Sequence, residues 1–214
     1  GEPGAPLRPG ITYVRVSRKR RKAIEGSAMP KVIGVVGSPR RGEATDTLVR
    51  EVLAGAEEAG SETLVFNLDE MEIMPCRGCL ACKEGEGCVQ DDGMQQLYAE
   101  LHDCDGVVLG TPIYFYNMTA QLKAFTDRLF ALLAPGFERR LGEEGRPAVF
   151  VVTQGAEDES LFAPVVDKMA EAFGLAGLPV RRTILAAAVE GGEGVLSSPE
   201  LAEEARRAGR ELLE

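Results

Sequence analysis

Short apolar runs alternate with amphipathic stretches from Lys31 to the end of the chain. The first run is Val32-Ile33-Gly34-Val35-Val36, and an uninterrupted apolar run of this length before a turn signal is typical of a buried strand. Apolar residues then recur at the spacing of one helix face, with charged residues on the opposite face. That apolar face consists of Leu48, Val49, Val52, Leu53 and Ala56, and Gly60 predicts the end of the helix.

The same alternation continues and predicts five strands and five helices in total. Such a pattern is typical of an α/β protein whose parallel sheet carries helices on both faces. Because crossovers between parallel strands are right-handed, we expect a doubly wound five-stranded sheet in the order 2-1-3-4-5. The further strands are predicted at Leu64–Phe66, Gly106–Gly110, Pro147–Thr153 and Val180–Ala187. The further helices are predicted from Asp91 or Asp92 to about Asp103, along Met118, Leu122, Phe125, Leu129 and Leu132, over Glu159–Phe173, and over Pro199–Leu213.

Charge and composition narrow the class of protein. The chain has 214 residues and a net charge of −10, but residues 1–30 carry seven Lys or Arg against two Glu, which leaves −15 for residues 31–214. An acidic surface repels phosphate backbones, so we expect no nucleic-acid partner. No apolar run approaches the ~20 residues of a membrane-spanning helix. We expect residues 1–30 to be a disordered basic extension, with Met29 as the natural start and residues 31–214 as the domain.

The loop after the first strand, residues 37–47, leads directly into the first helix. In an open parallel sheet, such a loop presents free backbone N–H groups at the positive end of a helix, which suits a phosphate. The side chains that could add donors are Ser38, Thr45, Thr47, and Arg40 or Arg41. A plainer alternative is that Thr45 or Asp46 only caps the helix. The motifs that hold nucleoside triphosphates and dinucleotides are both absent from this loop, which disfavours those ligands.

Two more loops are predicted at the same edge of the sheet. Residues 111–118 follow the third strand at the expected switch point of the strand order. They include three adjacent aromatic residues, Tyr114, Phe115 and Tyr116, which cannot all enter one core. At least one of them is therefore expected to face a ligand or a partner subunit. The third loop, Thr153-Gln154-Gly155, ends the fourth strand.

The sequence resembles the NADPH-dependent FMN reductase-like flavoproteins, and within them the iron-sulfur flavoproteins, over nearly everything from Lys31 onward. The matching motifs are Gly37-Ser38-Pro39-Arg40 with Thr45, Thr111-Pro112-Ile113-Tyr114, and Gln121-Leu122-Lys123-Ala124-Phe125 with Asp127-Arg128.

The resemblance implies a flavodoxin-like fold that binds FMN. It also implies that Ser38, Arg40 and Thr45 contact the FMN phosphate. The ribityl chain and ring would be bordered by Pro112, Ile113, Tyr114, Phe115, Tyr116 and Asn117. Ala44 departs from the family pattern, in which Asn is common. Thr47, Thr153, Gln154 and Gly155 complete the predicted cofactor site.

Four of the five cysteines fall in the long segment 68–92. Their spacing, Cys76-x2-Cys79-x2-Cys82-x5-Cys88, offers four thiolates to a [4Fe–4S] cluster and is similar to the compact motif of the iron-sulfur flavoproteins. Two alternatives remain: a zinc site, although structural zinc usually takes two separated Cys pairs, and four free thiols beside a flavin. Cys104 is expected to be an ordinary buried thiol. Clustered thiols without an export signal indicate a reducing compartment, and we expect the cytoplasm.

Three functions fit these patterns. The first is an FMN-dependent oxidoreductase in which a [4Fe–4S] cluster relays electrons to or from a carrier such as ferredoxin; it needs no catalytic side chain, because the cofactor supplies the chemistry. The second is an NAD(P)H-dependent reductase of free flavin or quinones without a cluster. The third is a non-enzymatic module for a phosphorylated ligand. The single histidine, His102, disfavours a hydrolase triad.

The aromatic loop further predicts a homodimer or homotetramer.

Overall fold

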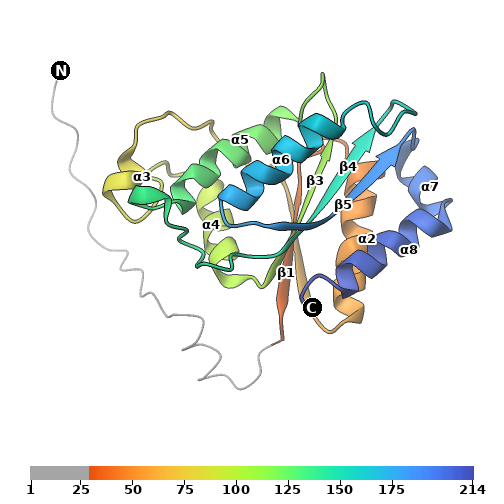
Figure 1. The fold of residues 1–214 in the computed structure, drawn as a ribbon, viewed down its shortest axis with the longest axis horizontal. Helices are drawn as coiled ribbons and strands as arrows, with labels where there is room; N and C mark the ends of the chain where they lie inside the picture. Colours follow the sequence, from red (N-terminus) through yellow and green to blue (C-terminus); the bar gives the residue numbers. More distant parts are fainter. Residues whose placement is uncertain (1–28) are drawn as a thin grey trace.

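The computed structural model describes residues 29–214, and its centre is a five-stranded parallel sheet (Figure 1). The sheet has the order β2-β1-β3-β4-β5, and every neighbouring pair of strands is parallel. The strands are β1 (Lys31–Val36), β2 (Glu62–Asn67), β3 (Gly106–Pro112), β4 (Ala148–Gln154) and β5 (Val180–Ala187). The predicted fold class and strand order are therefore confirmed. The predicted basic extension lies, as far as residue 28, outside the described residues.

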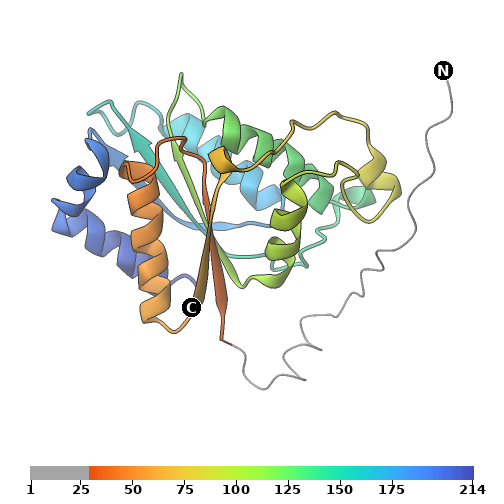
Figure 2. The ribbon, with the colours of Figure 1, turned by 180° about the vertical axis from the view of Figure 1, so that it is seen from behind.

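Helices cover both faces of the sheet (Figures 1 and 2). Side chains along a strand point alternately to opposite faces, so Ile33 and Val35 enter one core while Val32 and Val36 enter the other. The first core is covered by α4 (Met94–Asp103), α5 (Ala120–Arg128) and α6 (Ala163–Leu175). The second core is covered by α2 (Ala44–Glu58), α7 (Gly191–Leu196) and α8 (Pro199–Arg210). The continuous apolar strands of the sequence are thus explained by burial on both sides.

Several helix boundaries differ from the predicted ones, and residues 29–214 contain seven α-helices where five were predicted. The two that were missed, α7 and α3 (Ala81–Glu84), are too short to show a helical period. Helix α6 begins four residues later than predicted, because Asp158 accepts hydrogen bonds from both the N–H and the hydroxyl of Ser160 and holds that segment in a turn. Helix α8 ends at Arg210, three residues early, in a turn.

The stripe predicted from Met118 to Leu132 is not one continuous helix. Met118 is buried but precedes the N-cap residue Thr119, and the α-helical part ends at Arg128. The chain then continues through two 3-10 helices, η2 (Leu129–Leu132) and η3 (Pro135–Phe137). The apolar spacing was correct for burial but did not show the change from α to 3-10 geometry.

The cysteine segment follows η1 (Leu68–Glu70) and lies beyond the ends of α4 and α5 (Figure 1). Within residues 71–93, α3 is the only regular element. Among the helices of residues 29–214, none combines the length and the apolar character that crossing a membrane requires.

Candidate functional site: a pocket at the switch point and a cysteine loop

Three loops meet in a pocket of about 180 Å³ at the carboxyl edge of the sheet. They follow β1, β3 and β4, and the strand order reverses between β1 and β3, where open α/β sheets bind ligands. Nine of the predicted cofactor residues line this pocket. They are Ser38, Arg40, Thr45, Pro112, Ile113, Tyr114, Thr153, Gln154 and Gly155.

The loop after β1 is held tightly against the loop after β3. The N–H of Gly37 donates to Gly110 O over 2.8 Å, and Thr119 Oγ1 donates to Gly37 O over 2.6 Å. A Cβ on Gly37 would lie 2.8 Å from Leu122 Cβ and 2.9 Å from Gly110 O, so only glycine permits this approach. The start of α2 is thereby fixed beside the pocket.

Helix α2 begins at Ala44, and its N-cap residue Glu43 makes no side-chain capping hydrogen bond. Asp46 instead accepts the N–H of Gly42 over 2.8 Å, while Thr45 Oγ1 lies 2.8 Å from Thr153 Oγ1. The alternative that Thr45 caps the helix is therefore wrong, and Asp46 orders the loop from within the first turn. N–H groups at such a helix start are available to an anion.

Buried polar atoms surround the pocket. Ser38, Thr45, Thr153 and Gln154 are each less than 7% exposed. Gln154 Nε2 donates to Ala156 O and Asp158 O, but Gln154 Oε1 is buried and has no hydrogen-bond partner within residues 29–214. Because an unpaired buried acceptor costs free energy, this oxygen suits a donor on a bound ligand. The residues present therefore fit FMN.

The aromatic loop forms a tight turn between Tyr114 and Asn117, whose backbones exchange two hydrogen bonds. The two central residues, Phe115 and Tyr116, have φ values of +46° and +67°, a left-handed conformation that is uncommon for aromatic residues. Phe115 is 99% exposed, while Tyr116 makes an edge contact with Phe162. The turn thus projects an aromatic tip beyond the pocket, and such strain is most often found at functional positions.

Four predicted cofactor residues lie outside the pocket wall, namely Thr47, Phe115, Tyr116 and Asn117. Thr47 Oγ1 donates to Gly42 O over 3.2 Å, and a Cβ on Gly192 would lie 2.6 Å from it, so Thr47 faces α7. Sequence reasoning missed four residues of the wall: Glu43, Ala44, Val189 and Gly191. Val189 and Gly191 follow β5, whose carboxyl end lies at the same edge, and no local pattern indicated that this segment would reach the pocket.

The cysteine loop holds four free thiols. Cys76 and Cys79 are exposed, and Cys82 and Cys88 are half-buried. Gly78 and Leu80, on either side of Cys79, have φ values of +62° and +58°, and these left-handed residues turn the chain twice within the loop. In residues 29–214, no three His, Cys, Asp or Glu side chains gather closely enough to hold a single metal ion. The donor set itself, four thiols on one exposed loop, is the one that a [4Fe–4S] cluster requires.

A buried ion pair fixes the start of the cysteine loop. Arg128 Nη1 and Nη2 donate to the two oxygens of Asp92 over 2.6 and 3.1 Å, and Arg128 Nη1 also donates to Met74 O over 2.9 Å. Asp92 in turn accepts the N–H groups of Met74 and Met94. Burial would raise the pKa of Asp92, but its hydrogen bonds, the first of them from Arg128, outweigh burial and lower it. Asp91 or Asp92 was predicted to cap α4, but the N-cap residue is Gly93; Asp92, one position earlier, accepts the N–H of Met94 through Oδ1.

Helix α5 joins the two sites. Its N-cap residue Thr119 accepts the N–H of Leu122 and donates to Gly37 O in the loop after β1. Its last residue, Arg128, holds the cysteine loop. Tyr98 OH donates to Arg128 O over 2.6 Å and secures this end of the helix against α4. One rigid element therefore sets the spacing between the pocket and the cysteines.

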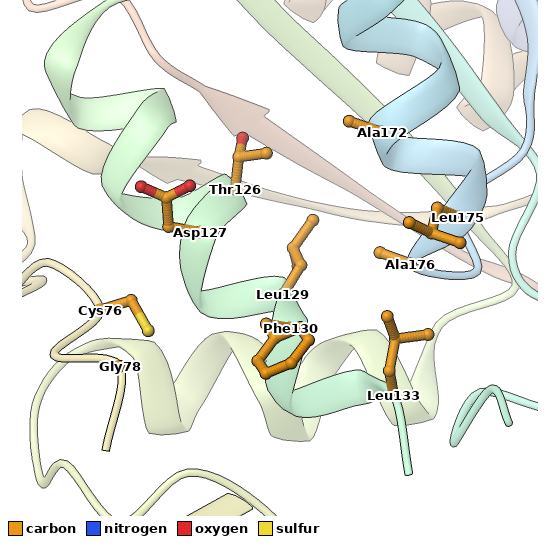
Figure 3. Close-up of a pocket in the computed structure, with 10 residues that line it drawn as sticks. All are labelled: Cys76, Gly78, Thr126, Asp127, Leu129, Phe130, Leu133, Ala172, Leu175 and Ala176. Carbon is orange, nitrogen blue, oxygen red and sulfur yellow. The ribbon is translucent and has the colours of Figure 1, made fainter. Parts of the chain in front are cut away.

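A larger cavity of about 430 Å³ lies beside the cysteine loop rather than at the switch point (Figure 3). Cys76 and Gly78 lie on one side of it, and Leu175, the last residue of α6, lies on the other with Ala176 directly after it, while Phe130 lies between them. Its wall is mostly apolar, and the hydroxyl of Thr126, which also lines it, already donates to Leu122 O within α5. The smaller pocket is therefore the better phosphate site.

Cys104 is placed as predicted, and the position of the single histidine is now known. Cys104 is fully buried, and burial raises the pKa of its thiol to about 12, which makes it inert. His102 lies in the last turn of α4 and is exposed.

The fold and the donor-lined pocket at the switch point define a flavodoxin-like protein. The sequence model of the NADPH-dependent FMN reductase family matches residues 30–188. The chain therefore belongs to this family of flavin-dependent oxidoreductases.

Individual relatives agree with this assignment. The chain is 38% identical to an iron-sulfur flavoprotein of Methanocaldococcus jannaschii over 61% of its own length and 67% of that protein. It is 36% identical to an iron-sulfur flavoprotein of Methanosarcina thermophila over 50% of its length and 56% of that protein. The matched part thus spans between about half and two thirds of these relatives. Among solved structures, the NAD(P)H:quinone oxidoreductase of Methanothermobacter marburgensis shares the fold, with a TM-score of 0.67, 18% identity, and coverage of 87% of this chain and 98% of that one.

Proposed function

We propose that this chain is an FMN-dependent oxidoreductase that carries a [4Fe–4S] cluster on its cysteine loop. The observation that carries the proposal is the convergence of three loops on the switch-point pocket, next to a separate loop with four thiols. The similarity to proteins named iron-sulfur flavoproteins supports it. When bound, FMN supplies the redox chemistry and the cluster relays single electrons.

The roles of the pocket residues follow from their positions. Ser38, Arg40 and Thr45, with the first N–H groups of α2, would hold the phosphate. Pro112, Ile113 and Tyr114 would border the ribityl chain and ring, and Thr153, Gln154 and Gly155 would close the opposite side. No side chain needs to act as an acid or a base, since the protein only binds and orients the cofactor and limits access of water.

The electron partner is proposed as a small carrier such as ferredoxin, or as NAD(P)H. The cluster would be ligated by Cys76, Cys79, Cys82 and Cys88. Because clustered free thiols persist only where the environment is reducing, the cytoplasm is the proposed compartment.

A second candidate function is an NAD(P)H-dependent reductase of flavin or quinone that has no cluster. Membership of the NADPH-dependent FMN reductase family favours it, as does the structural similarity to an NAD(P)H:quinone oxidoreductase. In this case, the four thiols would be structural.

An absorption spectrum of protein purified without oxygen, with iron and flavin assays, tests these functions. FMN with about four irons per chain would support the first function, and FMN without iron the second. Reduction of the bound flavin by ferredoxin but not by NAD(P)H would further favour the first. FAD, or no flavin at all, would contradict the binding of FMN, and a protein without flavin would favour a non-enzymatic phosphate-binding module.

Substitution Arg40→Ala is expected to weaken FMN binding about tenfold, or ~1.5 kcal/mol. Arg40 can give the phosphate a charge-assisted hydrogen bond, but it must first leave Glu43, to which its Nη2 is 3.0 Å away, so the effect falls at the low end of the usual range. Titration of the deflavinated protein with FMN measures it. Arg41→Ala is the matched control, because Arg41 pairs with Glu70 and does not line the pocket. Equal affinities for Arg40→Ala and wild type would show that backbone groups and hydroxyls suffice.

A homodimer or homotetramer is expected, with the aromatic tip and the cysteine loop near a subunit contact. Phe115 and Tyr116 are 99% and 68% exposed, and large exposed aromatic groups mark interfaces. Sedimentation at micromolar concentration measures the assembly state. Phe115→Ser should shift it toward the monomer, whereas Leu213→Ser, an exposed position beside Gly106 at the start of β3, should not. A monomeric wild type would exclude this prediction.

A further inference from the structure

Two cations hold the middle of the cysteine loop. Lys83, the residue after Cys82, donates from Nζ to Phe130 O over 2.7 Å and also to Leu133 O. Its ammonium group lies 3.6 Å from the centroid of the Phe130 ring. Lys83 belongs to the loop itself and is half-buried, so water screens its charge only in part.

Arg140 holds the same part of the loop. Its Nη2 donates to Cys82 O over 3.0 Å and to Gly85 O over 2.8 Å. Arg140 follows η3, so it belongs to a segment far from the loop in sequence. The two side chains together hold α3, the helix that carries the third cysteine, Cys82.

These two cations differ from the other anchors of the loop in their charge balance. The start of the loop is held by Arg128, whose charge is compensated by Asp92 at 2.6 Å, and its end by the neutral Gln95, which donates to Cys88 O over 2.9 Å. Within residues 29–214, neither Lys83 nor Arg140 forms an ion pair with a carboxylate, and their hydrogen bonds go to backbone carbonyl groups. Their positive charge is therefore available to a negative group bound by the cysteines.

Both cations hold one short segment of the loop: Lys83 lies within α3, and Arg140 donates to the carbonyl groups of Cys82 and Gly85 on either side of it. Two like charges this close to each other repel, and an anion between or beside them would relieve that repulsion.

We propose that Lys83 and Arg140 are positioning residues that form a cationic clamp on the cysteine loop and raise the reduction potential of the cluster bound there. A cubane with four thiolate ligands is an anion, and reduction adds one more negative charge. Uncompensated cations stabilise the reduced form more than the oxidised form. The clamp thereby offsets the strongly acidic character of residues 31–214, which by itself disfavours reduction. The inference rests on the proposed cluster.

The decisive variants remove the charge and keep a polar side chain. Lys83→Gln and Arg140→Gln each replace the cation by a neutral amide, and each should make reduction of the cluster about tenfold less favourable, a shift of ~59 mV to lower potential for one electron. A unit charge roughly 12 Å from a redox centre has this effect at an effective dielectric constant of ~20. Lys83→Arg keeps the charge and should keep the potential. The measurement is a redox titration of protein purified without oxygen, followed by electron paramagnetic resonance, with iron content recorded for each variant.

Arg210→Gln is the matched control, because Arg210 ends α8, which covers the opposite face of the sheet from α4 and α5, and it pairs with Glu58 at 2.7 Å. Its potential should equal that of the wild type. An unchanged potential in both Gln variants would overturn the clamp while leaving the proposed function intact, and so would an equal loss of iron from Lys83→Gln and Lys83→Arg. A wild-type protein without iron would overturn the clamp and the cluster together.

Discussion

Replacing Cys76, Cys79, Cys82 or Cys88 singly by Ser is expected to abolish or strongly destabilise the [4Fe–4S] cluster. Three thiolates leave one iron of the cubane without a protein ligand, so each of the four substitutions should have the same outcome. Iron content and visible absorption of protein purified without oxygen measure the effect, starting from about four irons per chain in the wild type. FMN should remain bound, because the pocket is formed by other loops.

Cys104→Ser is the internal control for this experiment. Cys104 is fully buried, its Sγ faces Leu101 O at 3.7 Å, and it is not part of the cysteine loop. This variant should retain both FMN and iron. If the wild type holds zinc, or no metal, the electron relay is excluded and the cluster-free reductase becomes the function that the site supports.

Arg128→Met should lower the free energy of unfolding by about 3–5 kcal/mol, the largest stability effect that we expect from a single substitution near the site. The substitution leaves the Asp92 carboxylate, whose side chain is 4% exposed, without its cation. It also removes the hydrogen bond to Met74 O that fixes the start of the cysteine loop. Urea unfolding followed by circular dichroism measures the change. Lys123→Met removes the exposed pair with Asp127 and should cost less than about 1 kcal/mol.

The Arg128 effect should depend on pH in a defined direction. The pKa of Asp92 is lowered in the folded state, so its contribution to stability is present above its unfolded pKa of about 3.9 and is lost as the pH falls through the lower folded pKa. The stability difference between the wild type and Arg128→Met should therefore be larger at pH 7 than at pH 3. A difference that is the same at both values would show that the carboxylate is not the group responsible.

The position of α5 gives these predictions a common structural basis. Thr119 at its start donates to Gly37 O in the loop after β1, and Arg128 at its end donates to Met74 O in the cysteine loop. A shift of this helix would move both sites at once. Arg128→Met, however, removes contacts only at the cysteine end, while Thr119 keeps its hydrogen bonds at the FMN end. We therefore expect this variant to reduce iron content more than FMN affinity.

The parallel sheet could be predicted because the chain repeats a simple physical signal. Strands buried on both faces must be apolar throughout, as in Val32–Val36, and helices covering them need one apolar face, as in Leu48–Ala56. Once the strands are parallel, the loops after Val36, Pro112 and Gln154 must lie at one edge. That these loops meet in one pocket could therefore be predicted without knowledge of side-chain contacts.

The partners within and around that site were decided by the tertiary structure alone. Thr47, predicted in the loop after the first strand, lies in the first turn of α2 and faces α7, and Glu43 and Val189 line the pocket although neither stood out in the sequence. Lys83 and Phe130 are 47 residues apart in the chain, and Arg140 and Cys82 are 58 apart. Local periodicity determines which face of its own element a residue occupies. Which distant residue it contacts depends on how whole helices and loops pack across the sheet. A pattern within one element therefore cannot indicate its partner in another.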